Sequence, residues 1–280
     1  MSKIDFFGTD VSWICPEGQL SCIQGMIAEN RTGYLTYTNV HVIRTCRNNE
    51  ILRTALHHAC VISPDGMPLA VAGRLAGAHC MAKCSGPDMM AKVLEMGVPL
   101  GYTHYFYGSK PETLACLKTQ LEANYPGIRI VGMHSPPYRD LTEAEDQEII
   151  QEINTLAPDF IWVGLGAPKQ EIWMYNHRNA FNKGLMMGVG AAFDFHAGTL
   201  KRAPLWMQRS GLEWFYRLVK EPRRLWKRYF VTNTLFLYYL LRYGVRIVDR
   251  PDTGLHVKME CEHNGICMES ARQEAREVYE

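Results

Sequence analysis

Two apolar runs that end in paired glycines constrain the fold of this chain more than any other feature. The first, at residues 160–163, leads into Gly164 and Gly166, and the second leads into Gly188 and Gly190. An apolar strand that ends in small residues before a helix presents backbone N–H groups to a phosphate. Close packing of a helix on a strand explains one such pair without any ligand. Two pairs so near each other in the chain favour a nucleotide-binding crevice.

Short apolar runs alternate with segments of helical periodicity over most of the chain. The predicted strands are 4–7, 34–38, 60–63, 102–107, 128–131, 160–163 and 185–189. The predicted helices are 42–59, 67–75, 88–96, 112–124, 142–156 and 169–181. Strands that are joined by helices pair in parallel through right-handed crossovers. The pattern therefore predicts an α/β fold, with a mostly parallel Rossmann-like sheet and helices on both faces.

Positive charge is concentrated near the C-terminal end. Residues 201–250 carry 12 Lys and Arg against three Asp and Glu, and residues 251–280 carry three against seven. Residues 1–200 are slightly acidic, with 15 against 19. Three parts are predicted: an α/β domain at 1–200, a basic aromatic helical appendage at 201–250 and an acidic, flexible tail at 251–280. The appendage needs an anionic partner, and charge confined to one stretch argues against nucleic acid.

The segment 204–243 has the composition of helices that lie on a membrane surface. It is basic and rich in Trp and Tyr, and Pro222 restarts a second helix within it. Such a stretch suits the interface of an anionic membrane, although a solvated basic face over a packed helix has the same pattern. No spanning helix is expected, because the apolar run 229–241 is shorter than the roughly 20 residues that a span needs. The first residues also lack the apolar core of a signal peptide.

Nine cysteines are scattered along the chain without the spacing of a disulfide framework. This distribution favours reduced thiols. Cys261, His263 and Cys267 lack the paired spacing of a zinc site. The sequence therefore predicts no metal and no other cofactor.

Polar residues follow three of the predicted strands and are candidates for chemistry. Asp65 comes directly after the strand 60–63, at the sheet edge where α/β folds bind ligands, and its carboxylate could deprotonate a hydroxyl nucleophile. The alternative is an aspartate that caps the next helix or forms an Asx-turn. Asn39 and His41 could orient a sugar hydroxyl, or Asn39 could only end its strand. Asp194 could contact a ligand hydroxyl or cap the following turn.

Cations of the appendage recur near three-, four- and seven-residue spacings, at Arg217, Lys220, Arg224, Lys227 and Arg228. At these spacings they could share one face of a helix. Guanidinium groups on such a face could clamp a phosphate as well as meet a membrane.

Short motifs occur in a fixed order over residues 4–245. They lie at 38–39, 64–66, 86–88, 135–137, 164–171, 188–198, 201–204, 211–218 and 221–224. Among the longest are Gly164-Leu-Gly-Ala-Pro-Lys-Gln-Glu171 and the run that starts Gly188-Val-Gly-Ala-Ala-Phe-Asp194. With this ordered set the chain resembles the WecG/TagA/CpsF glycosyltransferases, glycosyltransferase family 26.

Members of that family transfer a sugar from a UDP-sugar to a polyprenyl-diphosphate-linked saccharide, in bacterial cell-envelope and exopolysaccharide biosynthesis. The resemblance implies an inverting, metal-independent reaction by a peripheral protein at the cytoplasmic face of the inner membrane. It leaves the sugar open among N-acetylmannosamine, its uronate and a hexose such as glucose. It also leaves the oligomeric state open, a homo-oligomer included.

The resemblance assigns roles to individual residues. It implies that Asp65 is the general base and that Asn39 and a nearby threonine, Thr38, position the sugars. Arg217 and Arg224 would meet the diphosphate charge. The other expected substrate-binding residues are Gly108, Ser109, Gly164, Gly166, Gln170, Gly188, Gly190, Asp194, Lys83 and Lys227.

The chain departs from the family pattern at some of these positions. Many members have a threonine two residues before the asparagine. Here Tyr37 stands there, between Thr36 and Thr38, so the hydroxyl that serves the site is open. Lys83 and Lys227 stand where arginine is common, which keeps the charge but loses a bidentate fork.

Two other functions explain parts of the sequence. A nicotinamide-dependent oxidoreductase would account for the glycine turns, but Phe193 stands where the dinucleotide motif has its third glycine, and no acidic residue follows at the expected distance. A non-catalytic module that binds anionic lipid or polysaccharide would account for the appendage and leave Asp65 without a role. Glycosyl transfer accounts for both features.

Overall fold

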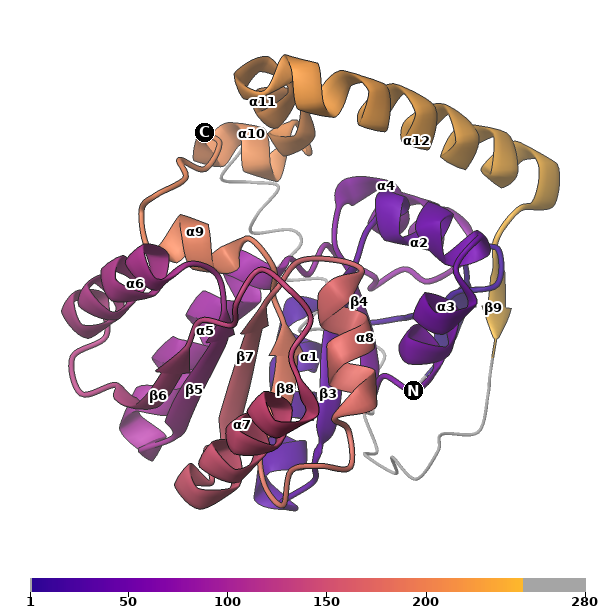
Figure 1. Cartoon of the computed structure of the whole chain (residues 1–280). Coiled ribbons are helices and arrows are strands. Elements are labelled where there is room, and N and C mark those ends of the chain that lie inside the picture. Colours follow the sequence, from indigo (N-terminus) through magenta and orange to yellow (C-terminus); the bar gives the residue numbers. More distant parts are fainter. Residues whose placement is uncertain (1, 249–280) are drawn as a thin grey trace.

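The centre of the molecule is a six-stranded sheet in the order β4-β3-β8-β7-β5-β6, with every neighbouring pair parallel (Figure 1). The computed structural model describes residues 2–248; the predicted tail at 251–280 and the side chains of Arg224 and Arg228 lie outside the described part. The strands are β3 (Gly33–Thr38), β4 (Val61–Pro64), β5 (Thr103–Gly108), β6 (Arg129–His134), β7 (Phe160–Gly164) and β8 (Leu185–Gly188). The predicted α/β fold is confirmed.

Helices cover both faces of the sheet, which is why its central strands are continuous apolar runs. One layer contains α1 (Pro16–Ala28), α5 (Gly86–Leu100), α6 (Pro111–Asn124) and α9 (Ala192–His196). The other contains α2 (Val40–Arg47), α3 (Glu50–His57), α7 (Glu143–Leu156) and α8 (Lys169–Asn176). In β7, Trp162 packs in the first layer and Val163 in the second, and both are fully buried. A further helix, α4 (Met67–Leu75), follows β4.

Several elements differ from the sequence prediction, and α1 lies in a stretch for which no helix was predicted. The predicted helix 42–59 is two helices, because Asn49 starts α3 by accepting a hydrogen bond from the Leu52 N–H at 2.9 Å. Apolar periodicity continues through this break and hides it. The predicted strand 4–7 lies outside the main sheet, where β1 (Lys3–Asp5) pairs antiparallel with β2 (Asp10–Ser12).

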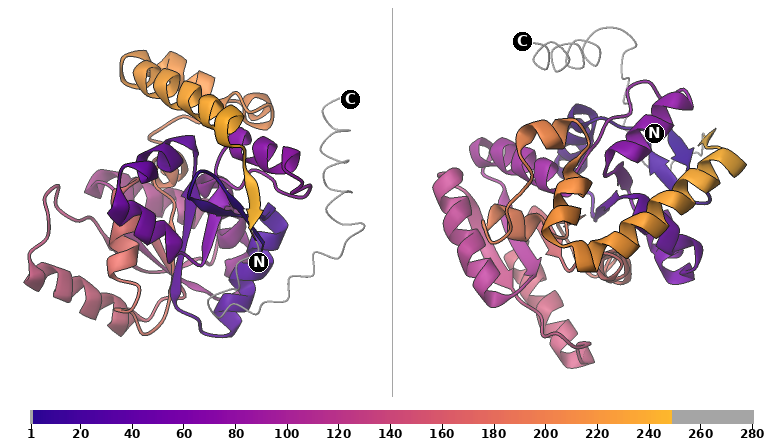
Figure 2. Two further views of the ribbon diagram at one scale, coloured as in Figure 1. Left: turned by 90° about the vertical axis from the view of Figure 1, so that its right-hand side faces the viewer. Right: turned by 90° about the horizontal axis from the view of Figure 1, so that it is seen from above.

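The appendage consists of α10 (Leu205–Arg209), α11 (Glu213–Lys220) and α12 (Pro222–Tyr243). It lies above the sheet in Figure 1 and crosses the core when seen from above in Figure 2. Pro222 is the first residue of α12, as predicted. After α12, β9 (Arg246–Val248) returns to the core and pairs antiparallel with β1, which the sequence pattern did not predict. The appendage is therefore attached to the core at both of its ends.

Two of the glycines predicted to bind the nucleotide are needed for packing between strand ends. Gly108 has a φ of +122°, and a Cβ there would lie 2.7 Å from the carbonyl carbon of Gly164. A Cβ at Gly164 would lie 2.6 Å from the ring of Phe193. A side chain at Gly108 would push the ends of β5 and β7 apart, and one at Gly164 would push α9 away from β7. The packing explanation for a strand-end glycine thus holds at these two positions.

Gly108→Ala should lower the free energy of unfolding by at least about 2 kcal/mol, because the new Cβ meets backbone and the φ is unfavourable for alanine. Gly198→Ala is the matched control, since Gly198 also has a positive φ, +73°, but its Cβ would meet nothing within 4 Å. Urea unfolding of both variants measures the difference. Equal losses would show that backbone conformation, not the Gly164 contact, makes glycine necessary.

Candidate active site

A cleft of about 410 Å³ opens where the carboxyl ends of β3, β4 and β8 face the appendage. Its walls come from both the α/β core and helices α11 and α12. The sequence-predicted residues that line it are Asn39, His41, Asp65, Lys83, Gly166, Gln170, Gly188, Gly190 and Arg217. The structure therefore brings together most of the predicted site from segments far apart in the sequence.

Other predicted site residues lie outside the lining of this cleft. They are Thr38, Gly108, Ser109, Gly164, Asp194 and Lys227. Asp194 accepts a hydrogen bond from Thr199 Oγ1 at 3.4 Å, as an aspartate that closes a local turn does. Lys227 is exposed on α12. The side chain of Arg224 is not described.

Asp65 lies half-buried at the end of β4, where its backbone N–H donates to the Thr38 carbonyl at 2.8 Å. Gly66 is the N-cap of α4 and no side chain caps that helix, so the alternative in which Asp65 only caps it does not hold. Burial raises the pKa of the Asp65 carboxyl to about 6, and the charge of Lys83 only partly opposes this. A carboxylate with a pKa near neutrality is suited to accept a proton from a hydroxyl.

Asn39 both caps a helix and contacts the candidate base. Its Oδ1 accepts from the backbone N–H groups of His41 and Val42 at 3.1 and 3.2 Å, which starts α2. Because capping uses the amide oxygen, the amide nitrogen is left to donate to the Asp65 carboxylate, and this bond lowers the pKa of Asp65. Asn39 thus combines the two alternatives: its amide oxygen caps α2, and its amide nitrogen contacts the candidate base.

The sequence left open whether Thr36, Tyr37 or Thr38 presents its hydroxyl to the site. The positions of the three side chains indicate which of them lies at the cleft. Thr36 Oγ1 donates to the buried Glu171 carboxylate at 3.0 Å, away from the cleft. Thr38 is fully buried and does not line the cleft. Tyr37 lines the cleft, and its hydroxyl accepts a hydrogen bond from Gln19 Nε2 at 3.0 Å. Tyr37 is therefore the member of the three that faces the site.

Gln170 joins the two glycine turns. Its Oε1 accepts from the Gly166 N–H at 3.2 Å, and its Nε2 donates to the Gly188 carbonyl at 3.0 Å and to Glu171 at 2.9 Å. Both polar atoms of the Gln170 amide thus already have hydrogen-bond partners within the protein. Glu171, which the sequence analysis missed, is fully buried, and burial raises the pKa of its carboxyl. These bonds fix the spacing of the turns at the cleft.

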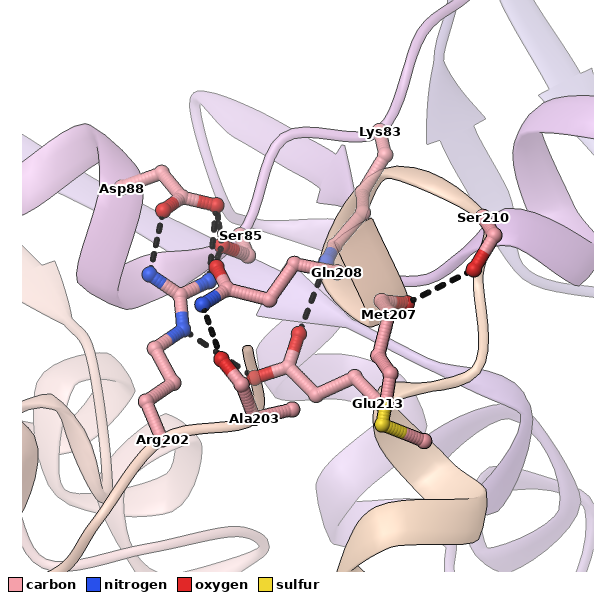
Figure 3. Close-up of polar contacts among 9 residues, drawn as sticks. All are labelled: Lys83, Ser85, Asp88, Arg202, Ala203, Met207, Gln208, Ser210 and Glu213. Atoms are coloured by element: carbon pink, nitrogen blue, oxygen red, sulfur yellow. Dashed lines mark hydrogen bonds and ion pairs between the residues drawn. The ribbon is translucent and has the colours of Figure 1, made fainter. Parts of the chain in front are cut away.

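An ion-pair network joins the appendage to the segment before α5 (Figure 3). Glu213 pairs with Lys83 Nζ at 2.9 Å and with Arg202 Nε at 3.1 Å. The Arg202 guanidinium also pairs with Asp88, which Ser85 contacts through its hydroxyl. Burial opposes ionisation of Glu213, but Lys83 and Arg202 hold the pKa of its carboxyl below the ordinary value. Lys83, predicted to bind substrate, is therefore engaged with Glu213 in this structure.

Arg217 is the appendage cation that faces the cleft without a counter-ion in the described part of the chain. Its Nε is buried and has no hydrogen-bond partner among the described residues, and its guanidinium carbon lies 6.0 Å from the centre of the Phe195 ring. A buried guanidinium nitrogen without a partner is costly unless a ligand satisfies it. The geometry thus suits contact with an anionic ligand, as predicted for this residue.

Within residues 2–248, no group of three or more His, Cys, Asp or Glu side chains has the arrangement to hold a metal ion. The same part of the chain contains no helix with the length and apolar character to cross a membrane.

The cleft combines a carboxylate with a raised pKa, two glycine turns that Gln170 holds together and a guanidinium without a counter-ion among the described residues. These features suit an enzyme that transfers a group. Residues 4–250 match the profile of the family described as "Glycosyl transferase WecG/TagA/CpsF family". The chain belongs to this family and is a glycosyltransferase.

Similar proteins bear the name N-acetylglucosaminyldiphosphoundecaprenol N-acetyl-beta-D-mannosaminyltransferase. The one from Bacillus subtilis (strain 168) is 34% identical over 167 residues, which span 60% of this chain and 63%, less than two thirds, of that protein. The one from Bacillus spizizenii is 28% identical over 71% of this chain and 76% of its own length. One from Staphylococcus aureus (strain MW2) is 27% identical over 80% of this chain and 87% of its own length.

Glu213→Gln should weaken the attachment of the appendage by about 1–3 kcal/mol, because it leaves two partly buried cations without their shared carboxylate. We expect a lower Tm and faster proteolysis within 205–243. Glu122→Gln, which removes only an exposed pair with Lys118, is the control and should change stability by less than about 0.5 kcal/mol. Identical Tm values for both variants would show that the network does not hold the appendage.

Proposed function

We propose that this enzyme transfers N-acetylmannosamine from a UDP donor to a polyprenyl-diphosphate-linked N-acetylglucosamine, with Asp65 as general base. The names of the similar proteins support this choice of sugar and acceptor. The observation that carries the mechanism is the position of Asp65, half-buried in the cleft with a pKa raised to about 6. Family membership favours this activity over the oxidoreductase and the non-catalytic alternatives.

In this mechanism the acceptor sugar hydroxyl lies against the Asp65 carboxylate. The hydroxyl proton passes to Asp65 while the oxygen forms a bond to the anomeric carbon of the donor sugar. The bond from that carbon to the UDP oxygen breaks on the opposite face, so the configuration inverts. Asn39 donates a hydrogen bond to Asp65 and keeps the carboxylate oriented.

The departing UDP carries negative charge that must be stabilised. The N–H groups of Gly166 and Gly190 already donate to Gln170 and to the Val163 carbonyl, but the buried Nε of Arg217, in the same cleft as Asp65, has no hydrogen-bond partner among the described residues. Preorganised donors of this kind stabilise charge that develops in a transition state. We infer that Arg217 stabilises the departing diphosphate without a metal ion.

Asp65→Asn should reduce transfer roughly 10²- to 10⁴-fold, because the variant cannot accept the proton. For the wild-type enzyme, kcat/KM should rise with pH through an apparent pKa near 6 and level off above it, and the variant should lose this inflection. The assay contains EDTA, so wild-type turnover also tests metal-independent departure of UDP. Turnover of the variant at the wild-type rate would remove Asp65 as the base.

Stability supplies the control for this variant. Since folding raises the pKa of Asp65 above its ordinary value, ionisation of Asp65 destabilises the fold as the pH rises through about 6. Asp65→Asn should therefore have a higher Tm than the wild type at pH 7–8, with the difference lost below about pH 4. A lower Tm at pH 7.5 would mean that misfolding, not lost proton transfer, explains an inactive variant.

We also propose that the outer face of the appendage binds the surface of an anionic membrane. Exposed apolar side chains on it are Leu205, Trp206, Phe215, Val219, Trp226, Phe230, Leu237 and Leu241. Exposed cations lie among them at Arg209, Lys220, Arg223, Lys227 and Arg242. Aromatic and basic side chains on one helical surface insert at, and are attracted to, an anionic interface. A polyprenyl-linked acceptor would then meet the cleft at that interface.

The double variant Trp226→Glu with Phe230→Glu should bind phosphatidylglycerol vesicles at least roughly ten-fold more weakly in a flotation assay, because two inserting side chains become anionic. Its rate with a short-chain, water-soluble acceptor should stay near the wild-type rate. The control is Leu100→Glu with Tyr138→Glu, which changes exposed side chains of the core. If the control loses as much vesicle binding, the appendage is not the membrane-binding surface.

A further inference from the structure

The face of α12 that packs toward the core contains a polar side chain over the cleft. Leu225, Tyr229, Thr232 and Phe236 recur at helical spacing on this face. Leu225 and Phe236 are buried, and Phe236 packs on Phe6 with ring centres 6.4 Å apart. Thr232 is 2% exposed and lines the cleft, as does its neighbour Asn233.

The Thr232 hydroxyl has no hydrogen-bond partner among the described residues. A threonine inside a helix usually donates to the carbonyl four residues earlier. Leaving a buried hydroxyl without a partner costs about 1–3 kcal/mol, and valine would fill the same space without that cost. The hydroxyl is therefore positioned to bond with a molecule that enters the cleft.

Arg217 brings a second unpartnered group into the same wall of the cleft. Its buried Nε belongs to α11, whereas Thr232 and Asn233 belong to α12. The facing wall of the core contains Asn39 and Asp65. The ligands that fit between these walls carry negative charge for the guanidinium, polar groups for the hydroxyl and amide, and a hydroxyl for the base.

The diphosphate of the donor supplies the negative charge, and an acceptor sugar supplies the polar groups and the hydroxyl. The glycine turns at Gly166 and Gly190 line the core side of the cleft, where the donor nucleotide would lie with its diphosphate toward Arg217, and the α12 side is left for the acceptor sugar. We propose that Thr232 and Asn233 form a binding subsite for the acceptor sugar, beside Arg217. The inference rests on the proposed function and adds two residues that bind the acceptor sugar.

The test compares Thr232→Val with the wild type, using UDP-N-acetylmannosamine and a short-chain polyprenyl-diphosphate N-acetylglucosamine. Loss of one hydrogen bond should raise the KM for the acceptor roughly three- to ten-fold. The KM for the donor should stay within about two-fold, because the donor lies against the core. The Tm should stay equal or rise, since the substitution removes a buried unsatisfied hydroxyl. A merely structural role for Thr232 would change the Tm and not the ratio of the two KM values.

Two further variants sharpen this comparison. Thr232→Ser should restore the acceptor KM, because it keeps the hydroxyl. Thr234→Val, at an exposed threonine two positions along the same helix, should leave both KM values unchanged. An unchanged acceptor KM in Thr232→Val, or an equal rise for the donor, would overturn the subsite. No transfer by the wild-type enzyme would overturn the proposed function itself, and the subsite with it.

Discussion

The ion pairs that Glu213 makes with Lys83 and Arg202 are the contacts on which the cleft depends. They join α11 of the appendage to the segment before α5, directly beside Asp65. Arg202 also pairs with Asp88, so two cations meet two carboxylates and no charge is left uncompensated. A partly buried network that is balanced in this way is tolerated, whereas loss of one member leaves an unpaired charge. Without the network the α11 side of the cleft would lose its ionic attachment to the core.

The attachment of the appendage and the chemistry of Asp65 are physically linked. The same appendage that carries Arg217 and Thr232 closes the space above Asp65 and brings Glu213 near it. Burial and the Glu213 charge both raise the pKa of Asp65, and Lys83 limits that rise. The raised pKa is therefore a property of the assembled cleft and not of the strand end alone. Its cost in stability is typical of sites where function requires an unfavourable environment.

The sequence predicted the parts of the site that depend on local features and missed the parts that depend on contacts between residues far apart in the chain. Asp65 and Asn39 were found because each follows an apolar run, and a strand end is a local feature. Glu171 and Glu213 were missed because their partners Thr36 and Lys83 lie 135 and 130 positions away. In one sequence such a glutamate looks like any helical acid that faces solvent. The two glycine turns were recognised, but local sequence could not show that Gly164 serves packing while Gly166 and Gly190 face the cleft.

The short strand β9 limits how the appendage, which forms one wall of the cleft, can move. It is only three residues long, too short for an alternating pattern to reveal it, yet it pairs with β1 through all three. A segment fixed at one end can rotate about a single hinge, but a segment fixed at both ends can only bow outward or release one attachment. Substrates and products would then enter and leave along the open sides of the cleft, between α12 and the core, without a swing of the whole appendage.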